Sequence, residues 1–212
     1  MTDPPPESAL LLDLGSATLG ESGALAMPCR VGAAWRGARL AAPTFPVCCV
    51  PGDNLAIHVA VTAAPAGSAL VVDVGNEPER GYWGEVLATA AKARGIPGLV
   101  IDGCVRDVAA LEEHGFPVFS TGVALPGATK ELPGAAGGSA EVGDVRVQTG
   151  DWLVGDADGV TAVAATELED VLAAGMARAD REQALFAALR DGKTTVELLD
   201  LDPTPIDEGE DR

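Results

Sequence analysis

The sequence has few aromatic residues and few basic ones. Phe, Trp and Tyr make up 4% of its 212 residues, so a hydrophobic core has to be built mainly from Ala, Val and Leu. Only 14 Lys and Arg residues stand against 32 Asp and Glu residues, which gives a formal net charge of -18. Because nucleic-acid affinity rests largely on cationic contacts to phosphates, this charge argues against direct nucleic-acid binding.

Long hydrophobic runs are also missing. No apolar stretch approaches the roughly 20 residues that a membrane helix needs. The first seven residues, MTDPPPE, are acidic and rich in proline, unlike a signal peptide. We therefore expect a cytoplasmic protein without membrane contact. The four cysteines form no CxxC pair, and we expect them to be small buried residues in a reducing compartment: Cys29, Cys48, Cys49 and Cys104.

Several catalytic signatures are absent as well. The chain contains no GxSxG nucleophile elbow, no P-loop and no GxGxxG run. The stretch VVDVGNEPERG (71–81) could offer backbone N–H groups to a phosphate, but the missing glycine run argues against a dinucleotide or methyl-donor site. The two histidines, His58 and His114, lie on a predicted helix and beside a helix-ending glycine. We interpret both as structural or solvent-exposed residues.

The order of the predicted elements indicates an α/β fold in which strands alternate with helices. A helical region at 16–24 precedes a strand at 39–50 whose prolines place it near a sheet edge. After these, the predicted strands are 68–75, 98–103 and 116–122, and the predicted helices are 53–64, 83–94 and 107–115.

The last third of the sequence has a different character. Short strand-like pieces separated by Gly-Asp turns predict an antiparallel meander over 135–165. A helix is predicted over 166–190, with Gly175 as a point where it kinks or divides. The sequence thus predicts one domain over 1–199, followed by an acidic, disordered tail over 200–212.

One short stretch, GLVIDGCVRD (98–107), raises a functional question because an apolar strand is followed by Arg106 and Asp107. Asp107 could simply complement the dipole of the next helix, which leaves Arg106 without a role. Alternatively, both side chains lie at the carboxyl end of a strand, where open α/β sheets gather ligand sites. These residues alone do not decide between the two interpretations.

A second acidic residue strengthens the functional interpretation. Glu85 begins the predicted helix 83–94, which follows the preceding strand. If the two strands are parallel neighbours joined by a right-handed crossover, both loops lie at the same edge of the sheet. Glu85, Arg106, Asp107 and the free N–H groups near Val86 and Leu87 would then converge on one pocket.

The segment WGEVLATAAKARGIPGLVIDGCVRD (83–107) resembles the RraA-like family, which includes divalent-metal-dependent aldolases that cleave 4-hydroxy-4-methyl-2-oxoglutarate and 4-carboxy-4-hydroxy-2-oxoadipate. The family signature is an acid, twenty intervening residues and Arg-Asp, which Glu85, Arg106 and Asp107 match. Aldolases of the family commonly have aspartate at the position of Glu85. The resemblance implies a swivelling β/β/α domain, with parallel strands bearing the site and an antiparallel meander, assembled as a homotrimer or homohexamer.

The resemblance also implies roles for individual residues. Asp107 would be the direct protein ligand of Mg²⁺ or Mn²⁺, and Arg106 would stabilise a pyruvate enolate. Gly84 and the amides of Val86 and Leu87 would bind the pyruvyl carboxylate of a 2-keto acid substrate.

A proton-transfer group is implied in two places. Glu85 would hold a water beside the metal. A further acid would come from the C-terminal helix of an adjacent subunit, with Glu182 as the best match and Glu21 as a weaker one.

The implied function is cleavage of a 4-hydroxy-2-oxo acid to pyruvate, with oxaloacetate decarboxylation as a possible second activity. The family also contains non-catalytic members that bind and inhibit the ribonuclease RNase E and lack the full metal-binding pattern. Because Glu85, Arg106 and Asp107 are all present, the sequence favours the enzyme over the regulator.

Overall fold

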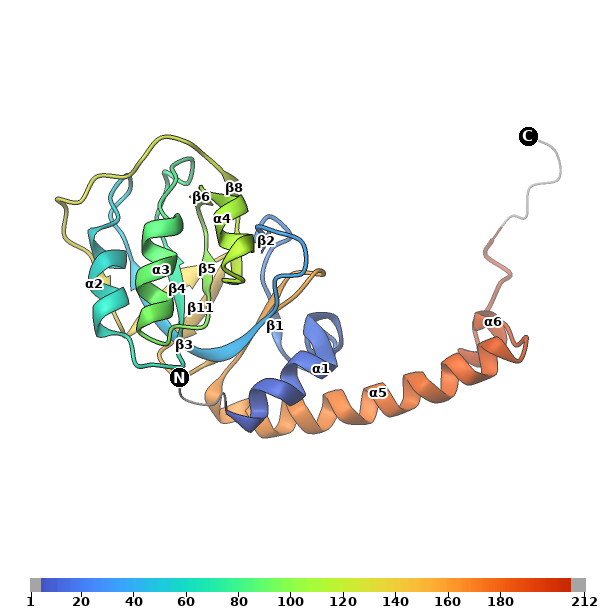
Figure 1. The fold of residues 1–212 in the computed structure, drawn as a ribbon. Coiled ribbons are helices and arrows are strands. Elements are labelled where there is room, and N and C mark those ends of the chain that lie inside the picture. Colours follow the sequence, from blue (N-terminus) through green and yellow to red (C-terminus); the bar gives the residue numbers. More distant parts are fainter. Residues whose placement is uncertain (1–4, 207–212) are drawn as a thin grey trace, which may run out of the picture.

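The computed structural model describes residues 5–206, which form a body of mixed α/β structure and a long helix that leaves it (Figure 1). The helices are α1 (Pro6–Gly20), α2 (Leu55–Ala63), α3 (Glu85–Ala93), α4 (Val108–Glu113), α5 (Leu168–Arg190) and α6 (Thr195–Leu198), with a 3-10 turn at Ala165–Glu167. Within the described residues, no helix combines the length and the apolar character needed to cross a membrane.

The body is organised around one large mixed sheet. Its strands, in spatial order, are β1 (Leu25–Ala26), β13 (Val160–Val163), β12 (Trp152–Gly155), β3 (Leu40–Cys48), β4 (Ala69–Asp73), β5 (Leu99–Ile101), β7 (Val118–Ser120) and β2 (Gly32–Ala33), and β9 (Ala135–Ala136) also pairs with β3. The pairs β3–β4, β4–β5 and β5–β7 are parallel, whereas β12, β13, β1 and β2 add antiparallel partners. The α/β fold, the parallel centre and the antiparallel meander are therefore confirmed.

Two small sheets complete the body. β10 (Ser139–Val142) and β11 (Val145–Gln148) form an antiparallel hairpin, and β6 (Cys104–Val105) pairs in parallel with β8 (Gly122–Val123). The second pair lies beyond the ends of β5 and β7, near α4 (Figure 1). It extends the parallel strands toward the end of the body where Arg106 and Asp107 follow β6.

Three hydrophobic clusters hold these layers together. Successive residues of β4 point to opposite faces, so Leu70 joins a cluster with α2, α3 and α4, whereas Val71 joins one with the β10–β11 hairpin. A third cluster joins α1 and α5 to the outer strands through Leu11, Leu19 and Val171. A parallel sheet covered on both faces reads as continuous apolar runs, which is why LVV (70–72) lacks alternation.

The prediction that the proline-containing strand lies near an edge is wrong, because β3 runs between β12 and β4. The prolines fall where β3 changes partner on one side. Pairing with β12 ends at Pro43, and pairing with β9 begins at Val47. Between these points the carbonyl of Pro46 still accepts a hydrogen bond from the Gly137 N–H at 2.8 Å. A central strand tolerates proline there because a change of partner already interrupts the ladder.

The boundaries predicted for the first helix, 16–24, are also wrong. α1 begins at Pro6, where the missing N–H of proline costs nothing, and it ends at Gly20. Gly15, with φ 78°, breaks it internally. After this break the Ser16 N–H and hydroxyl donate to Asp156 at 2.8 and 2.5 Å, so a residue far along the chain restarts the helix. A sequence window cannot contain that partner.

Gly175 does not divide the last helix, because α5 is continuous from Leu168 to Arg190. A Cβ at Gly175 would lie 2.9 Å from Leu14 Cδ1 of α1. Glycine is needed here for the close approach of α1 and α5. Gly175 is thus a packing position and not a hinge.

The expectation that the cysteines are buried is wrong for all four. Cys29 is exposed, the other three are half-buried, and none forms a disulfide. Burial, followed by the nearby Asp53 charge, raises the pKa of Cys49 to about 12. That thiol therefore stays protonated at neutral pH.

The predicted division into a domain over 1–199 and a tail over 200–212 remains a prediction. Residues 201–206 are exposed and form no helix or strand. Residues 207–212 lie outside the described part of the chain.

Candidate functional site

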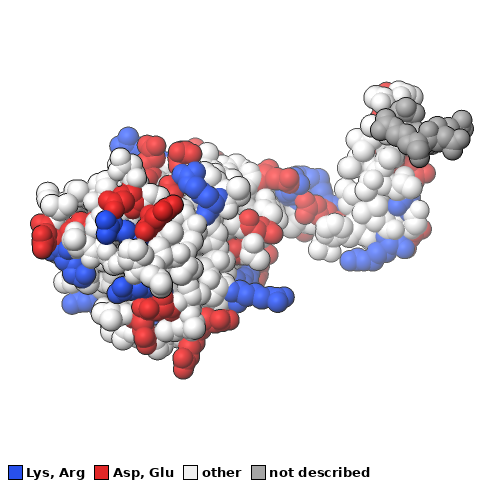
Figure 2. Space-filling view, turned by 90° about the horizontal axis from the view of Figure 1, so that it is seen from above, with Lys and Arg blue, Asp and Glu red and all other residues white. Residues whose placement is uncertain are grey.

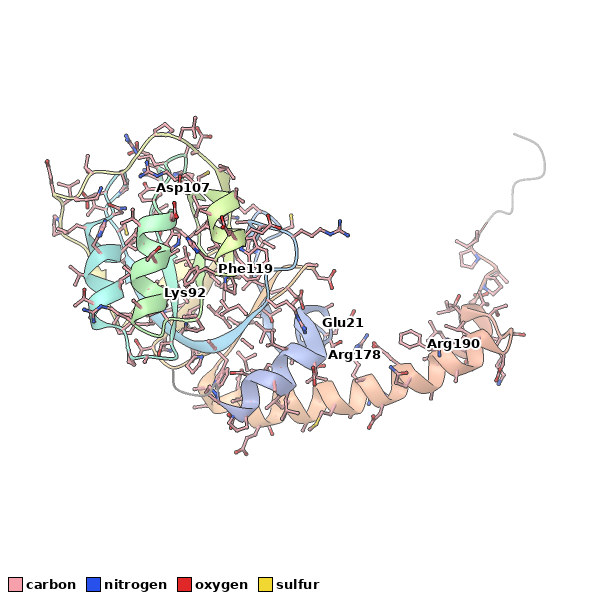
Figure 3. The ribbon with its side chains drawn as sticks, in the orientation of Figure 1. Glu21, Lys92, Asp107, Phe119, Arg178 and Arg190 are labelled. Atoms are coloured by element: carbon pink, nitrogen blue, oxygen red, sulfur yellow. The ribbon has the colours of Figure 1, made fainter. Side chains whose placement is uncertain are left out.

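A pocket of about 210 Å³ opens at the end of the body where the parallel strands finish. Residues that line it come from the start of α2 and the residue before it, from the loop before α3 and the first turn of that helix, from the turn after β6 and from the loop before β9: Asn54, His58, Gly81, Tyr82, Gly84, Val86, Leu87, Arg106, Asp107, Gly127, Ala128 and Lys130. Asp107 projects between the upper ends of α3 and α4 (Figure 3). The structure thus brings most of the predicted site residues together.

Arg106 and Asp107 are held by backbone contacts on both sides of the turn. A β-bridge joins Trp83 to Val105, and the Arg106 N–H donates to the Trp83 carbonyl at 2.8 Å. Asp107 has a left-handed conformation, with φ 59°. Such a conformation is uncommon outside glycine and is maintained by the surrounding structure. It lets the chain turn at Asp107 into α4 immediately after the strand.

Two glycines permit the close approach of these side chains. A Cβ at Gly84 would lie 2.4 Å from Asp107 Oδ2, and one at Gly81 would lie 3.1 Å from Arg106 Cδ. Gly84 has an extended backbone, with φ -162°, so glycine is required there by lack of space and not by its conformation. The loop before α3 and the Arg-Asp turn therefore fit together only with small residues.

The N-terminus of α3 faces the same pocket. The Glu85 N–H donates to Asp107 Oδ2 at 3.1 Å, and the first bond within the helix runs from the Ala88 N–H to the Gly84 carbonyl. The N–H groups of Val86 and Leu87 make no hydrogen bond among the described residues, and both residues line the pocket. Open N–H groups at the positive end of a helix favour an anionic ligand.

Among the residues that the structure describes, Asp107 is the only one with a carboxylate that lines the pocket. Its Oδ2 accepts the Glu85 N–H, whereas no hydrogen bond between described residues uses Oδ1. No group of three or more His, Cys, Asp and Glu side chains with metal-binding proximity occurs within residues 5–206. One free carboxylate oxygen fits a hard cation such as Mg²⁺, which usually keeps several waters, but not a closed structural zinc site.

Glu85 has its carboxylate outside the lining of the pocket. Oε1 lies 3.2 Å from Nε2 of His114, and the Glu85 side chain is 54% exposed. The His114 carbonyl in turn accepts a hydrogen bond from Lys92 Nζ at 2.6 Å. His114 is therefore a partner of Glu85, a role that sequence reasoning did not assign to it.

Glu182 and Glu21 are both distant from the pocket of their own chain and share one cation. Arg178 Nε lies 2.8 Å from Glu182 Oε1, and the same guanidinium pairs with Glu21. In Figure 3, Glu21 and Arg178 lie together where α1 meets α5, well away from Asp107. The two acids named as alternatives for the neighbouring-subunit role belong to one cluster.

Among the lining residues that sequence reasoning did not assign to the site are Asn54, His58 and Lys130. Lys130 reaches the pocket because Asp53 fixes its loop. The buried Asp53 carboxylate accepts hydrogen bonds from the N–H groups of Leu55, Glu131 and Leu132 and from the Thr129 hydroxyl, at 2.6 to 3.1 Å. Burial opposes ionisation of Asp53, but these hydrogen bonds outweigh it and lower its pKa to about 2.

His58 lies one helical turn after Asn54 at the start of α2. Burial lowers the pKa of His58, and the positive charge of Lys130 lowers it further against a smaller opposing effect of Asp53. The spacing of four residues was visible in the sequence as a shared helix face. It could not show that the loop carrying Lys130 closes over that face.

A family model described as RraA-like, Aldolase/RraA, matches residues 13–162. The chain belongs to the RraA-like family. Among the relatives of this RraA-like chain is a protein of Halalkalibacterium halodurans provisionally named 4-hydroxy-4-methyl-2-oxoglutarate aldolase. The two are 34% identical over 140 residues, which cover 66% of this chain and 67% of the relative.

Solved structures agree with the RraA-like fold. An uncharacterised protein of Pseudomonas syringae pv. tomato superposes with a TM-score of 0.79 at 24% identity, covering 92% of this chain and 93% of its own. The RNA-processing inhibitor RraA from Thermus thermophilis superposes with a TM-score of 0.61 at 27% identity, covering 66% and 85%. Proteins similar to this chain are thus named both for aldolase activity and for inhibition of RNA processing.

Proposed function

We propose that the protein is a divalent-metal-dependent, class II-type aldolase that cleaves a 4-hydroxy-2-oxo acid, such as 4-hydroxy-4-methyl-2-oxoglutarate, and releases pyruvate. The observation that carries this proposal is the meeting of Asp107, Arg106 and the open N–H groups of α3 in one pocket. The name of the Halalkalibacterium relative supports the same chemistry.

The charges of the pocket suit a negatively charged substrate. Arg106 and Lys130 line it together with one carboxylate, Asp107. This local balance is opposite to the net charge of -18 of the whole chain. A 2-keto acid with a second carboxylate would gain from both cations and from the α3 N-terminus.

The residues have separate tasks in the proposed reaction. The Val86 and Leu87 N–H groups bind the carboxylate next to the 2-oxo group, with Gly84 leaving room for it. Arg106 stabilises the negative charge that appears on the 2-oxo oxygen as the enolate forms. A Mg²⁺ or Mn²⁺ ion held by Asp107 would supply Lewis-acid polarisation of the same 2-oxo group.

Cleavage breaks the bond between C3 and C4 of the substrate. The hydroxyl on C4 loses its proton and becomes a carbonyl, and the electron pair of the broken bond forms the pyruvate enolate, which then takes a proton at C3. A water oriented by Glu85 accepts and returns the proton, assisted by Glu182 of a neighbouring subunit. To reach that water, the exposed Glu85 carboxylate turns away from His114. Oxaloacetate reaches the same enolate by losing CO₂, which makes decarboxylation a second activity of this site.

We also propose that the protein acts as an oligomer. A homotrimer or homohexamer in the cytoplasm would let α5 of one subunit approach the pocket of another, without nucleic-acid or membrane partners. The supporting observations are the long exposed part of α5 and the absence of a second acid among the residues that line the pocket.

The test is incubation of the purified protein with Mg²⁺ or Mn²⁺ and a panel of 4-hydroxy-2-oxo acids and oxaloacetate, with pyruvate as the readout. Reactions without protein correct for metal-catalysed decarboxylation. We expect pyruvate release that stops with a chelator and in Asp107→Ala, but not in Glu113→Ala, which removes an exposed carboxylate from the end of α4, the helix that follows Asp107. Full activity of Asp107→Ala would contradict the assignment of the metal site.

A second candidate function is non-catalytic regulation of a ribonuclease. The observation that favours it is the likeness to the Thermus RraA, which is named as an RNA-processing inhibitor. Titration of this protein into a ribonuclease E cleavage assay distinguishes the two candidates. Inhibition at micromolar concentration, together with no pyruvate from any acid of the panel, would favour the regulator.

A further inference from the structure

The side chain of Glu85 is held outside the pocket by a residue at the end of α4. Its Oε1 lies 3.2 Å from His114 Nε2, and neither residue lines the pocket. The Glu85 N–H nevertheless donates to Asp107 Oδ2 at 3.1 Å, so the backbone of Glu85 lies beside the proposed metal ligand while its carboxylate points elsewhere. The proposed reaction needs this carboxylate at a water in the pocket. The contact with His114 therefore competes with the position in which Glu85 would act.

The contact between Glu85 and His114 is a hydrogen bond in either protonation state of the imidazole. An ionised carboxylate has only acceptor oxygens, so the ring nitrogen that faces it has to carry a proton. A neutral ring with its proton on Nε2 and a charged ring both meet this condition. The side chains of Glu85 and His114 are 54% and 37% exposed, and an exposed pair typically shifts an equilibrium by up to about fivefold. Such a contact can open and close within each turnover.

A second contact fixes the position of His114. Lys92, about two helical turns after Glu85 on α3, donates from Nζ to the His114 carbonyl at 2.6 Å. The His114 N–H donates to the Ala110 carbonyl of α4 at 2.9 Å. The helix α3 thus contacts His114 twice, once at its backbone and once at its ring. Because Lys92 binds the backbone, replacing the imidazole leaves this link between α3 and α4 intact.

The length of the Glu85 side chain gives it the choice between two positions. An aspartate on the same backbone would be one methylene shorter and would not reach the His114 ring. Before a cation binds, a second carboxylate beside Asp107 would be repelled, and His114 gives Glu85 a partner in that state. A cation between the two carboxylates would reverse this preference.

We propose that His114 is a positioning residue that holds the Glu85 carboxylate in a resting position, which the carboxylate leaves to orient the proton-accepting water. This rests on the proposed function, which gives Glu85 its task. Leaving His114 then costs part of the rate at which the substrate hydroxyl loses its proton. Oxaloacetate has no such proton, so its decarboxylation does not require Glu85 to leave His114.

The kinetic test removes the imidazole and compares two reactions of the same site. We would measure kcat/KM with Mg²⁺ for 4-hydroxy-4-methyl-2-oxoglutarate and for oxaloacetate, because this constant covers every step from the free enzyme to the transition state. His114→Ala should raise the first value about two- to fivefold, the range expected for an exposed pair, and leave the second unchanged. His114→Gln, whose amide can still donate to Glu85, should stay close to the unmodified protein. So should Glu113→Ala, the matched control at the neighbouring exposed position.

The variant Glu85→Asp decides whether the effect of His114 passes through Glu85. Since the shorter acid does not reach the ring, adding His114→Ala to Glu85→Asp should change neither kcat/KM value. A role of His114 in the fold would appear in both backgrounds and would lower the thermal unfolding temperature. Circular dichroism during heating measures that temperature for each variant.

A second readout needs no turnover. The chain has two histidines, His58 and His114, so the imidazole NMR signals of isotope-labelled protein can be assigned by the loss of one set in His114→Ala. Without additions, the His114 signals should differ between the unmodified protein and Glu85→Asp. Addition of Mg²⁺ and pyruvate, the proposed product, should shift them toward those of Glu85→Asp. Identical His114 signals in the two proteins before any addition would show that the contact does not form.

The kinetic outcomes separate this inference from the proposed function. If the unmodified protein released pyruvate from neither acid, the proposed function and the resting position of Glu85 would both fall. If it cleaved both acids while His114→Ala left their ratio unchanged or lowered it, only the resting position would be rejected. Equal changes in both reactions would also reject it, since His114 would then act on the shared enolate or on the fold.

Discussion

Arg106 and Asp107 face the pocket because the preceding loop leaves space for their side chains and holds their backbone, and not because of their own conformational preferences. Gly81 and Gly84 leave the space that their side chains occupy, and the Trp83 carbonyl holds the Arg106 N–H. The Arg-Asp pair and its distance from Glu85 were visible in the sequence. The reorientation of Glu85 toward His114 was not, because it depends on where α4 ends relative to α3.

Replacing Arg106 by Lys should lower turnover far more than it weakens substrate binding. The guanidinium is proposed to stabilise charge that appears only as the enolate forms, and an ammonium cannot reproduce its planar, directed donors. Loss of one such group typically costs on the order of a hundredfold in rate. Steady-state kinetics should show a reduced kcat for both 4-hydroxy-4-methyl-2-oxoglutarate and oxaloacetate. A change confined to KM would show that Arg106 only binds substrate.

Gly84→Ala should inactivate the site without unfolding the protein. The new Cβ would lie 2.4 Å from Asp107 Oδ2, so the carboxylate must move, and a displacement of about 1 Å can cost on the order of a hundredfold in rate. Asp107 is partly exposed and can move without disturbing the core. The measurement is pyruvate release together with the thermal unfolding temperature.

Gly32→Ala is the control for that experiment, because no atom lies within 4 Å of its added Cβ. Its activity should match the unmodified protein. If Gly84→Ala retained full activity, the position of the Asp107 carboxylate would not matter to the reaction, which would contradict its role as the metal ligand.

At the scale of elements, local patterns predicted most helices and strands, but long-range partners decided the exceptions. The helix predicted over 53–64 was observed as α2, and the strand predicted over 68–75 as β4. β3 was placed wrongly because its prolines fall at a change of partner between β12 and β9, which only the folded sheet reveals. His58 and Lys130 were missed for the same reason. Their meeting depends on a loop held by Asp53, some 77 residues before Lys130.

Asp53→Asn should test whether the Asp53 carboxylate holds this loop, because the stability that the carboxylate contributes should depend on pH. The folded-state pKa of Asp53 is about 2, against an ordinary value of 3.8, because the hydrogen bonds from the 129–132 loop and Leu55 outweigh burial. A lowered pKa contributes stability that is complete above the unfolded-state value and is lost as pH falls through the folded-state value. The contribution is therefore full at pH 7 and disappears as pH falls from about 4 to about 2, with a magnitude of about 2 kcal/mol.

Urea unfolding at a series of pH values measures this contribution. At pH 7 the variant should be less stable by about 2 kcal/mol or more, because an amide nitrogen would also face backbone N–H groups. The difference between the two proteins should shrink toward pH 2. A difference that stayed constant with pH would show that the Asp53 carboxylate does not bind the loop as an anion.

At the scale of the whole molecule, the distal part of α5 and α6 extend away from the body as an arm. Figure 2 shows the body and the end of the arm as two masses joined by a narrow connection. The arm carries exposed apolar residues, among them Met176 at 46% and Phe186 at 43% exposure. No residue that the structure describes in the same subunit covers them. This exposure supports the proposed homo-oligomer, and sedimentation showing only monomer at micromolar concentration would count against it.

A sharper test asks whether active sites are shared between subunits. Asp107→Ala removes the proposed metal ligand from the pocket, whereas Glu182→Gln removes the proposed acid from the arm. Each variant alone should be inactive or nearly so. In a mixed oligomer, a pocket of the Glu182→Gln subunit can receive the arm of an Asp107→Ala subunit, and that site again has both groups.

Random mixing in equal amounts gives such a site with a probability of one half times one half, so about a quarter of the unmodified activity should return in a symmetric ring. Native mass spectrometry would verify that mixed oligomers form. Mixed oligomers without any recovered activity would show that the pocket and the arm act within one subunit. Full activity of Glu182→Gln alone would transfer the role to Glu21, which shares Arg178 with Glu182, and the same mixing experiment with Glu21→Gln would then decide whether either acid serves a neighbouring pocket.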